Sequence, residues 1–323
     1  MLATKDPAAS LEAALPSPEL RLLRAYGLGT VFALTVLWLA AQFLAFEPQL
    51  GLQRVGAQLT PMAGPSVDHL LGTDQLGRDL LLRLVASVDS FYLPGLFAAL
   101  VVLFLSVPAG TLLGYRDGGL LALVVSFLLT TLSSWPRLVL VVVGVAMFTA
   151  MVSDPAAWEE QRLFMLGGLV GLSYVPDLAR ALAARLRSLR QQSFVEACRA
   201  HGLSERSILL RHMLLTNCWR IVLRHCCLVF GAFLLVETSL SYLGDYGVPP
   251  PRPSWGNMLA GVKSSVLTSR GLIFGADSSL SDGLFLAVNQ GGLLAVLAPS
   301  LAIILSIGGL LALAEYLARR DWR

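Results

Sequence analysis

Charged residues are scarce in this chain. Only 14% of its 323 residues are charged, whereas 55% are hydrophobic, and the mean hydropathy is +0.69. So much apolar surface exceeds what one soluble core can bury, which excludes an ordinary soluble domain. The apolar runs also lack the alternating polarity of a membrane β-barrel. Because backbone groups in lipid must hydrogen-bond within their own segment, the sequence predicts an all-α membrane protein.

Cysteine and histidine are also rare, with four of each. Most of them gather in one region: Cys198, Cys218, Cys226 and Cys227, with His201, His212 and His225 close by in the sequence. Their spacing matches no common zinc pattern, so a metal site is the weaker of two interpretations. We instead expect four free thiols that pack as small apolar residues in a reducing compartment.

Motifs for nucleotide hydrolysis and for common hydrolases are missing. The chain has no GxxxxGK sequence followed by Ser or Thr, no HExxH zinc-protease motif and no GxSxG nucleophile elbow. Its few histidines do not gather with carboxylates as in an integral membrane enzyme. We therefore expect no catalytic residues, no metal and no cofactor held by this chain.

Long apolar runs are what the chain has instead. A membrane-spanning helix needs about 20 mostly apolar residues. Runs of this kind lie at residues 27–46, 93–114, 119–150, 163–176, 222–243 and 293–317. The fourth run is short, and its helix is expected to continue past Pro176. Six spans predict a transmembrane domain over 27–317, between tails at 1–26 and 318–323.

The basic residues predict how these spans are oriented. The segment from Pro176 to His225, which joins the fourth and fifth runs, holds nine arginines: Arg180, Arg185, Arg187, Arg190, Arg199, Arg206, Arg211, Arg220 and Arg224. Loops rich in arginine stay in the cytoplasm. The loop 177–221 is therefore expected inside, together with both termini. The loops 47–92 and 244–292 are then expected on the outer side of the membrane.

The inner loop contains a helix, a turn and a second helix. Glu196 and Ala197 lie in the first helix, Gly202 is expected to break it, and Ser204 is a good N-cap for the next. An apolar stripe accompanies the charges: Phe194, Ala197, Cys198, Ile208, Leu209 and Met213. Such an amphipathic pair of helices suits a membrane protein that presses against a soluble partner.

Two further motifs lie in the loops that are expected outside. The first is Gly72-Thr73-Asp74, two residues, then Gly77-Arg78-Asp79. Thr73 or Asp74 can cap a helix that begins near Gln75, while Arg78 and Asp79 can pair with neighbours or with another subunit. This motif either contacts substrate or, as we favour, only orients the second span.

The second outer motif begins at Glu237 and combines small residues, prolines and a tryptophan: Gly244, Pro250, Pro253, Ser254, Trp255 and Gly256. The proline run has stiff, extended geometry and cannot be helical. Trp255 is expected at the level of the lipid headgroups. The segment is expected to be a plug or a docking ledge for an external protein, or else simply a stiff turn between spans.

These motifs together resemble a known family. Glu196-Ala197-Cys198, three residues, then Gly202 is similar to the Glu-Ala-Ala…Gly coupling loop of ABC importer permeases. With the two outer motifs, the chain resembles the C-type permease of the dipeptide, oligopeptide and nickel branch. This resemblance implies a type I importer permease fold, in which Glu196 pairs with a basic residue of an ATPase, Arg199 adds contacts and Ser204 starts the second coupling helix.

The resemblance also implies partners, a location and a cargo. The partners are a B-type permease, two ATP-binding subunits that hold ATP and Mg, and an extracytoplasmic substrate-binding protein. The location is the bacterial cytoplasmic membrane, and the cargo is expected to be peptides. Nickel or other metal chelates are an alternative within the family. In a different class, a six-span channel or secondary carrier would transport without a partner ATPase.

Two charged residues fall inside predicted spans, where charge is costly and often functional. Arg137 is the pathway candidate, because its guanidinium would meet the carboxylate of a peptide if it faced the bundle centre. Otherwise it pairs with an acid such as Glu237, or extends to the membrane surface. Glu237 itself is expected to bond to a neighbouring helix or to face the pathway. Close helix packing is expected at the pairs Gly110 and Gly114, and Gly167 and Gly171.

The chain departs from the family pattern in two places. No proline follows Leu214, so the second coupling helix is expected to run more continuously into the fifth span. The loop 261–292 is longer than the pattern requires, and an extra outer element is expected there that contacts a particular binding protein.

Overall fold

The computed structural model describes most of the chain, namely residues 18–43, 54–55, 58–59, 63–74, 76–115, 118–151, 159–244, 246–248, 252–262 and 292–320. Its elements in chain order are α2 (Pro18–Phe43), β1 (Arg54–Val55), β2 (Gln58–Leu59), α3 (Leu80–Tyr115), α4 (Leu120–Ser134), α5 (Arg137–Met151), α6 (Glu159–Arg190), α7 (Ser193–Ala200), α8 (Glu205–Ser207), the π-helix η2 (Ile208–Cys218), α9 (Trp219–Leu243) and α12 (Gly292–Arg320). Residues 255–262 form a further short helix. The predicted all-α class is confirmed.

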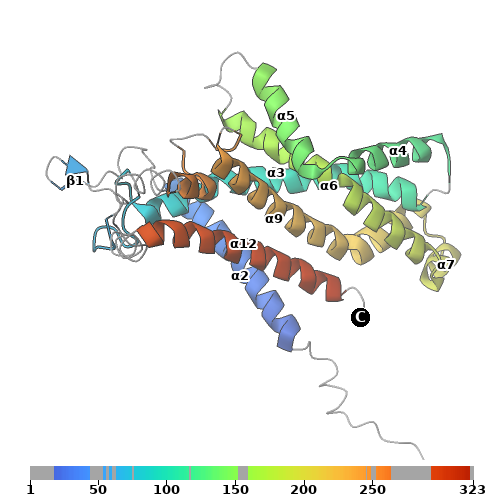
Figure 1. The fold of residues 1–323 in the computed structure, drawn as a ribbon. Coiled ribbons are helices and arrows are strands. Elements are labelled where there is room, and N and C mark those ends of the chain that lie inside the picture. The colour runs from blue at the N-terminus through green and yellow to red at the C-terminus, as the bar shows by residue number, and fades with distance from the viewer. Residues whose placement is uncertain are drawn as a thin grey trace, which may run out of the picture.

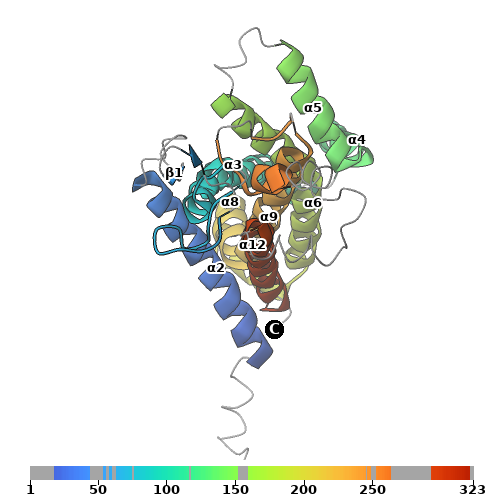
Figure 2. The same ribbon diagram turned by 60° about the vertical axis from the view of Figure 1, so that its left-hand side comes forward.

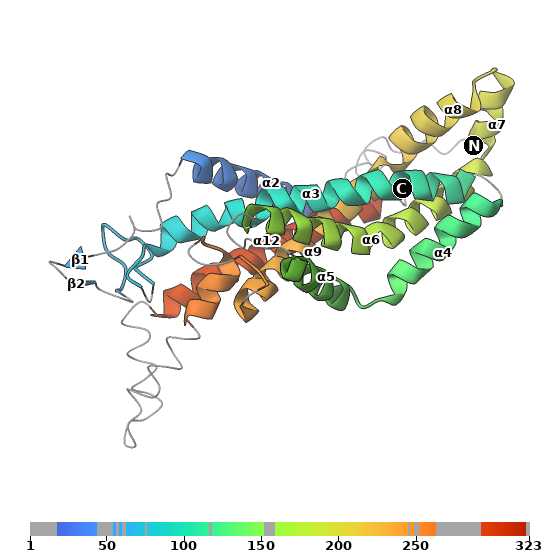
Figure 3. The same ribbon diagram turned by 90° about the horizontal axis from the view of Figure 1, so that it is seen from above.

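The long helices form an elongated bundle with two distinct ends (Figure 1). The antiparallel hairpin of β1 and β2 lies at one end, with the start of α3, whereas α7 and α8 lie at the other (Figure 3). We name these the Asp74 end and the Gly202 end. α2 and α12 lie on one side of the bundle, and α4 and α5 stand out on the opposite side (Figure 2). An ion pair of 3.4 Å between Arg319 and Glu19 joins the end of α12 to the start of α2.

Glycines bring α3 and α6 together at the centre of the bundle. A Cβ added to Gly110 or Gly114 would lie 2.7 or 2.8 Å from backbone atoms of α6. Added to Gly167 or Gly171, it would lie 2.5 or 2.6 Å from carbonyl oxygens of α3. Side chains at these four positions would push the backbones apart, because membrane helices pack closest through small residues. Both predicted glycine pairs are thus confirmed as packing sites.

Replacing Gly171 by leucine is expected to destabilise the fold by about 1–3 kcal/mol, because the new side chain has no room against α3. Gly29 of α2 is the matched control, since nothing lies within 4 Å of a Cβ added there. Thermal unfolding of both variants in detergent, followed by size-exclusion chromatography, measures the difference. Equal melting of Gly171→Leu and Gly29→Leu would contradict the packing described here.

The third predicted run, 119–150, is not a straight span. It forms two helices, α4 and α5, which meet at a bend of 90°. The reason is Pro136, which follows Ser134 and the extended residue Trp135. A proline has no N–H for the helix ladder and forces the preceding residue out of helical geometry.

Length and apolarity identify four spans among the described residues, or five if the bent pair counts as one. The fourth predicted run, 163–176, lies in α6, which continues past Pro176 as predicted. The second half of α6 carries Asp177 and several arginines, which lowers its mean hydropathy. Two helices start earlier than the predicted spans, α2 at Pro18 and α3 at Leu80. The predicted extra element in 261–292 lies mostly outside the described residues.

Candidate functional site

The predicted helix, turn and helix of the inner loop is confirmed at the Gly202 end. α7 stops at Ala200, and Gly202 takes a φ of 78°. Its N–H donates to the carbonyl of Arg199 at 2.9 Å, and the N–H of Leu203 donates to that of Cys198 at 3.1 Å. Residues with side chains seldom adopt this φ, so the glycine permits the reversal. The Ser204 hydroxyl then accepts the N–H of Ser207 and caps α8, as predicted.

The face that this turn exposes differs from the predicted stripe. Ile208 and Met213 are fully buried in the core of the chain itself and cannot press against a partner. Most of the predicted coupling residues are exposed instead: Glu196, Ala197, Arg199, Gly202 and Ser204, with Cys198 half-buried. Leu203 adds an exposed apolar side chain at the tip. The exposed face is therefore formed by α7 and the turn.

Glu205 fastens the turn to the long helix α3. One of its carboxylate oxygens accepts from Arg199 Nε at 2.8 Å, and the other accepts from the Tyr115 hydroxyl. Tyr115 is the last residue of α3, and its carbonyl accepts from Arg190 Nη1 at 2.8 Å at the end of α6. Sequence reasoning missed Tyr115 and Glu205 because 90 residues separate them. Together these residues join the turn to both central helices.

The π-helix η2 links the turn to α9 without interruption. Together α8, η2 and α9 form one continuous apolar helical stretch, Glu205–Leu243. This bears out the continuous connection predicted from the missing proline. Thr216 Oγ1 and Asn217 Nδ2 donate to the carbonyls of Arg211 and His212, each five residues earlier. Such side-chain bonds satisfy carbonyls in the wide turn, and π-helices often occur at functional positions.

Asp74 organises the opposite end of the molecule. Its Oδ1 accepts the N–H groups of Leu76 and Arg78, each at 2.9 Å. Its Oδ2 lies 2.8 Å from Arg78 Nε and 3.3 Å from Arg83 Nη1. Asp74 and Arg83 are both buried, and Arg83 Nε has no hydrogen-bond partner in the described part of the chain. Asp74 is therefore the counter-ion for two arginines.

The prediction that Thr73 or Asp74 caps a helix near Gln75 is wrong. The helix α3 begins at Leu80, and Asp79 is its cap, accepting the N–H of Leu82 at 2.8 Å. Asp79 also contacts His69 Nδ1 at 2.7 Å, and Thr73 pairs with it across an isolated bridge. Gly72 and Gly77 supply positive φ angles of 81° and 75°. The motif therefore closes on itself at the start of α3.

Glu237 lies completely buried near the end of α9, with 0% exposure. Its carboxylate accepts from the Ser241 hydroxyl at 2.7 Å and from the Thr238 hydroxyl at 3.4 Å. Among the described residues these hydrogen bonds stay within α9, so the predicted bond to a neighbouring helix, or a position facing the pathway, stays a prediction. Gly256 allows the short helix 255–262 to approach α9, because a Cβ there would lie 2.2 Å from the Thr238 carbonyl oxygen. Gly244, with a φ of 126°, ends α9.

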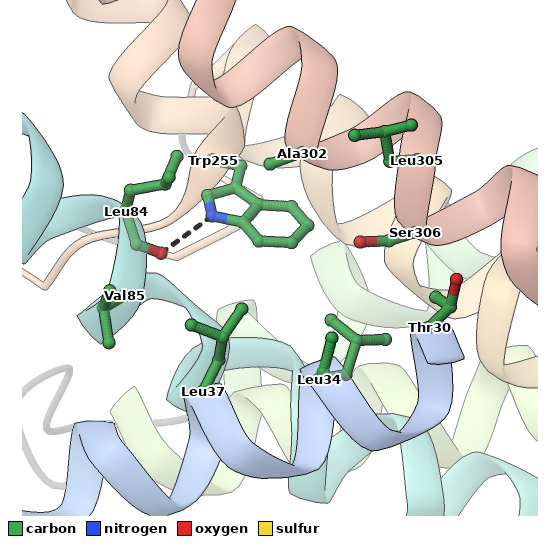
Figure 4. Close-up of a pocket in the computed structure, with 10 residues that line it drawn as sticks. Thr30, Leu34, Leu37, Leu84, Val85, Trp255, Ala302, Leu305 and Ser306 are labelled. Carbon is green, nitrogen blue, oxygen red and sulfur yellow. Dashed lines mark hydrogen bonds between the residues drawn. The ribbon is translucent and has the colours of Figure 1, made fainter. Parts of the chain in front are cut away.

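Trp255 is buried within the protein, whereas the sequence predicts it at the level of the lipid headgroups. Its side chain is only 2% exposed, its Nε1 donates to the Leu84 carbonyl at 3.0 Å, and its ring lies 4.7 Å from that of Phe91. Figure 4 shows the indole at the edge of a cavity of about 210 Å³ between α2, α3 and α12. Pro253 also binds α3, accepting from Ser90 Oγ at 2.7 Å. Pro250 lies outside the described residues. Trp255 therefore anchors this segment to α3.

Arg137 pairs with an acid, as one of the alternatives predicts, but the acid is Asp177 and not Glu237. Its guanidinium binds Asp177 of α6 and lies 4.0 Å from the ring centre of Tyr174. One turn further along α6, Arg180 Nη2 donates to Ser133 Oγ of α4 at 3.0 Å. These contacts fix α6 to both sides of the bend at Pro136. Within the described residues, Arg137 thus has a positioning role, although its side chain is also exposed.

The described residues contain no group of three or more His, Cys, Asp or Glu side chains arranged to hold a metal ion. All four cysteines are free. What the site offers is an exposed turn at one end, joined to the central helices, and two closed polar motifs at the other.

Comparison with known proteins identifies relatives. Residues 106–321 match the family model of the binding-protein-dependent transport system inner membrane component. The chain is 28% identical over 204 residues to a glutathione transport system permease protein, GsiD, of Pectobacterium atrosepticum, covering 63% of each chain. It is 27% identical over 199 residues to a dipeptide transport system permease protein, DppC, of Alkalihalophilus pseudofirmus, covering 62% of this chain and 61% of the relative.

A third relative is a putative peptide transport system permease protein of Brucella suis, 32% identical over 201 residues and covering 61% of each chain. The chain thus matches a little over three fifths of the length of these relatives. The family model matches more than half of the chain, including α6, the turn, α9 and α12. The chain therefore belongs to the family of binding-protein-dependent transport system inner membrane components, and its all-α architecture is that of a type I ABC importer permease.

Proposed function

We propose that this chain is the C-type permease subunit of a binding-protein-dependent ABC importer and forms a peptide pathway with a B-type permease. One observation carries the proposal: an exposed helix and turn, Ser193 to Ser204, is joined by Glu205 to the central helices of a membrane protein. Because the chain has no nucleotide-binding motif, an ATP-driven movement must come from another subunit, and this exposed surface is where that subunit would bind.

The mechanism follows from the stiffness of that connection. Two partner subunits bind ATP and Mg and close on each other, which carries the turn sideways. Tyr115 and Glu205 pass this displacement to α3, and the glycine contacts make α3 and α6 move as one body. A packed pair has few alternative arrangements, so the whole pathway rocks between inward-open and outward-open states. Glu196, exposed on α7, is placed to pair with a basic residue of the ATPase.

The orientation in this proposal places the Gly202 end in the cytoplasm. The positive-inside rule supports it, because α6 ends with Arg187 and Arg190 and the turn carries Arg199 and Arg206. The start of α2 and the end of α12 lie together and point toward the same side. The Asp74 end then faces outward, where an extracytoplasmic binding protein delivers the cargo.

Peptides are the proposed cargo because relatives carry the names of peptide, dipeptide and glutathione permeases. Arg137 remains the candidate contact for an anionic group, although Asp177 already neutralises it. No described side-chain group favours nickel or a metal chelate, the alternative within the family. A channel or secondary carrier has no partner ATPase, so that alternative does not account for the exposed turn at Gly202.

Co-purification of the tagged chain from its native membrane tests the proposal. Replacing Gly202 by valine strains the turn, and we expect the recovery of ATPase subunits, measured by mass spectrometry, to fall severalfold. Gly118→Val is the matched control, because Gly118 has almost the same φ, 77°, and is equally open. Equal loss from both variants, or a chain that purifies alone and moves solute without ATP, would overturn the proposed coupling surface.

A further inference from the structure

A second cavity, of about 310 Å³, opens between four membrane helices. Only apolar atoms are exposed in it. Its floor is nearly inaccessible and comes from four helices: Leu34 of α2, Ala99 of α3, Phe230 of α9 and Leu313 of α12. Its rim is formed by Leu28 and Val31 of α2, Leu96 of α3 and Leu223 of α9, each between 38% and 47% exposed. The groove is thus open on its rim side.

The groove exists because α2 separates from its neighbours. Near the Asp74 end α2 packs on α3, where the Thr35 and Tyr92 hydroxyls lie 2.8 Å apart and Trp38 stacks on Tyr92. Toward its start, α2 stays against α12 at Gly27 and Leu313 but diverges from the rest of the bundle. In a bilayer such a surface faces the hydrocarbon and not water.

Two arginines lie on the helices of the groove, nearer the Gly202 end than its lining residues. Arg24 lies one turn before Leu28 on α2, so helical spacing places it on the same face, and it is exposed. Arg220 lies one turn before Leu223 on α9, with its guanidinium 5.4 Å from the Trp219 ring centre. Side chains lean toward the start of their own helix, and both helices start on the side of the Gly202 end. Arginines next to apolar surface extend toward the headgroups in this way.

We propose that this groove binds one acyl chain of an anionic phospholipid, whose phosphate lies between Arg24 and Arg220. The groove extends from Leu28 to Leu34 on α2 and from Leu223 to Phe230 on α9. At 1.5 Å per residue this is roughly 10 Å, within one leaflet of a hydrocarbon core about 30 Å thick. A lipid therefore places its tail in the groove and its headgroup at the arginines.

An acyl tail suits this groove, because only apolar atoms are exposed in it and its rim is open to the hydrocarbon. The two arginines add attraction to a negative headgroup, which distinguishes a lipid from an apolar helix of another subunit. The proposal requires only that the chain lies in a bilayer, and it does not depend on peptide cargo or on ATPase coupling.

Native mass spectrometry of the full-length chain tests the proposal, with phosphatidylglycerol and phosphatidylcholine of identical tails as probes. We expect phosphatidylglycerol to be retained preferentially. The double variant Arg24→Gln and Arg220→Gln should weaken its binding about tenfold and leave phosphatidylcholine unchanged. Arg206→Gln, an exposed arginine away from the groove, is the control. Equal retention of both lipids by the unaltered chain would overturn the proposal.

A second variant tests the tail without touching charge. Cys226 lines the groove, so Cys226→Phe should fill part of it and reduce binding of both lipids severalfold. Unchanged binding of phosphatidylglycerol to this variant would place the lipid elsewhere. Loss of bound phosphatidylglycerol when a second permease joins the complex would assign the groove to that subunit and also overturn the proposal.

Discussion

Replacing Asp74 by alanine is expected to lower the free energy of unfolding by about 3–5 kcal/mol, the cost of removing one partner from a buried ion pair. Arg78 and Arg83 would lose their shared counter-ion, and the N–H groups of Leu76 and Arg78 would lose their acceptor. Arg83 is 4% exposed, so water cannot replace the carboxylate. Thermal unfolding in detergent and the yield of folded protein after membrane extraction measure the effect.

Matched variants separate the causes of that loss. Asp68→Ala removes an exposed acid from the same loop and should be neutral. Asp74→Asn keeps the acceptor for the two N–H groups but not the charge, so an intermediate loss is expected. Adding Arg83→Met to Asp74→Ala should recover part of the stability, because an apolar side chain leaves no unpaired buried charge. If Asp74→Ala and Asp68→Ala unfold alike, Asp74 does not hold this end together.

The turn at Gly202 could be predicted because its signals are local. A glycine that ends one helix and a serine that caps the next lie within three residues and need no tertiary information. The same applies to the helix classes and to the glycine pairs of α3 and α6, whose four-residue spacing places them on one face. The bend at Pro136 also had a local signal, the proline itself, but its angle depends on the packing of α4 and α5 against α6.

The predictions that needed correction are those in which tertiary structure selects one of several candidate partners. Trp255 finds its acceptor 171 residues away on α3, so hydropathy alone placed it at the membrane surface. Arg137 had several acids within conceivable reach, and only the position of α6 selects Asp177. At the Asp74 end two aspartates could each cap a helix. The choice of Asp79 depends on where α3 begins, which the Asp74 turn itself decides.

The observed positions of Asp74 and Trp255 change the role of the Asp74 end. A capping role for Asp74 would leave Arg78 and Arg83 free to contact substrate, whereas the observed pairing occupies them within the motif. A surface Trp255 would offer a ledge to another protein, whereas the buried indole ties residues 252–262 to α3. The same segment packs closely on α9, because a Cβ on Gly256 would lie 2.2 Å from the Thr238 carbonyl oxygen. This end is therefore a rigid cap over α3 and α9, and movement of these helices must carry it along.

Replacing Glu205 by alanine is expected to uncouple ATP hydrolysis from transport. The carboxylate is the described side-chain link between the Gly202 turn and α3, through Arg199 and Tyr115. Without it the turn should still dock on the ATPase, since the exposed residues of α7 remain, but α3 would no longer follow its displacement. In proteoliposomes that hold the whole importer, we expect peptide uptake to fall at least tenfold, equivalent to about 1.4 kcal/mol or more of lost coupling, while ATP hydrolysis continues.

Tyr115→Phe should reproduce this uncoupling, because it removes one hydroxyl from the same joint and leaves the ring against Arg190. Arg206→Ala, which changes an exposed neighbour of Glu205, should leave both rates unchanged. Parallel measurement of hydrolysis and uptake distinguishes the failures. Loss of both rates would show that Glu205 serves docking. Uptake equal to that of the unaltered importer would show that displacement reaches α3 by another route, either through α6, which directly precedes α7, or through the continuous helix from η2 into α9.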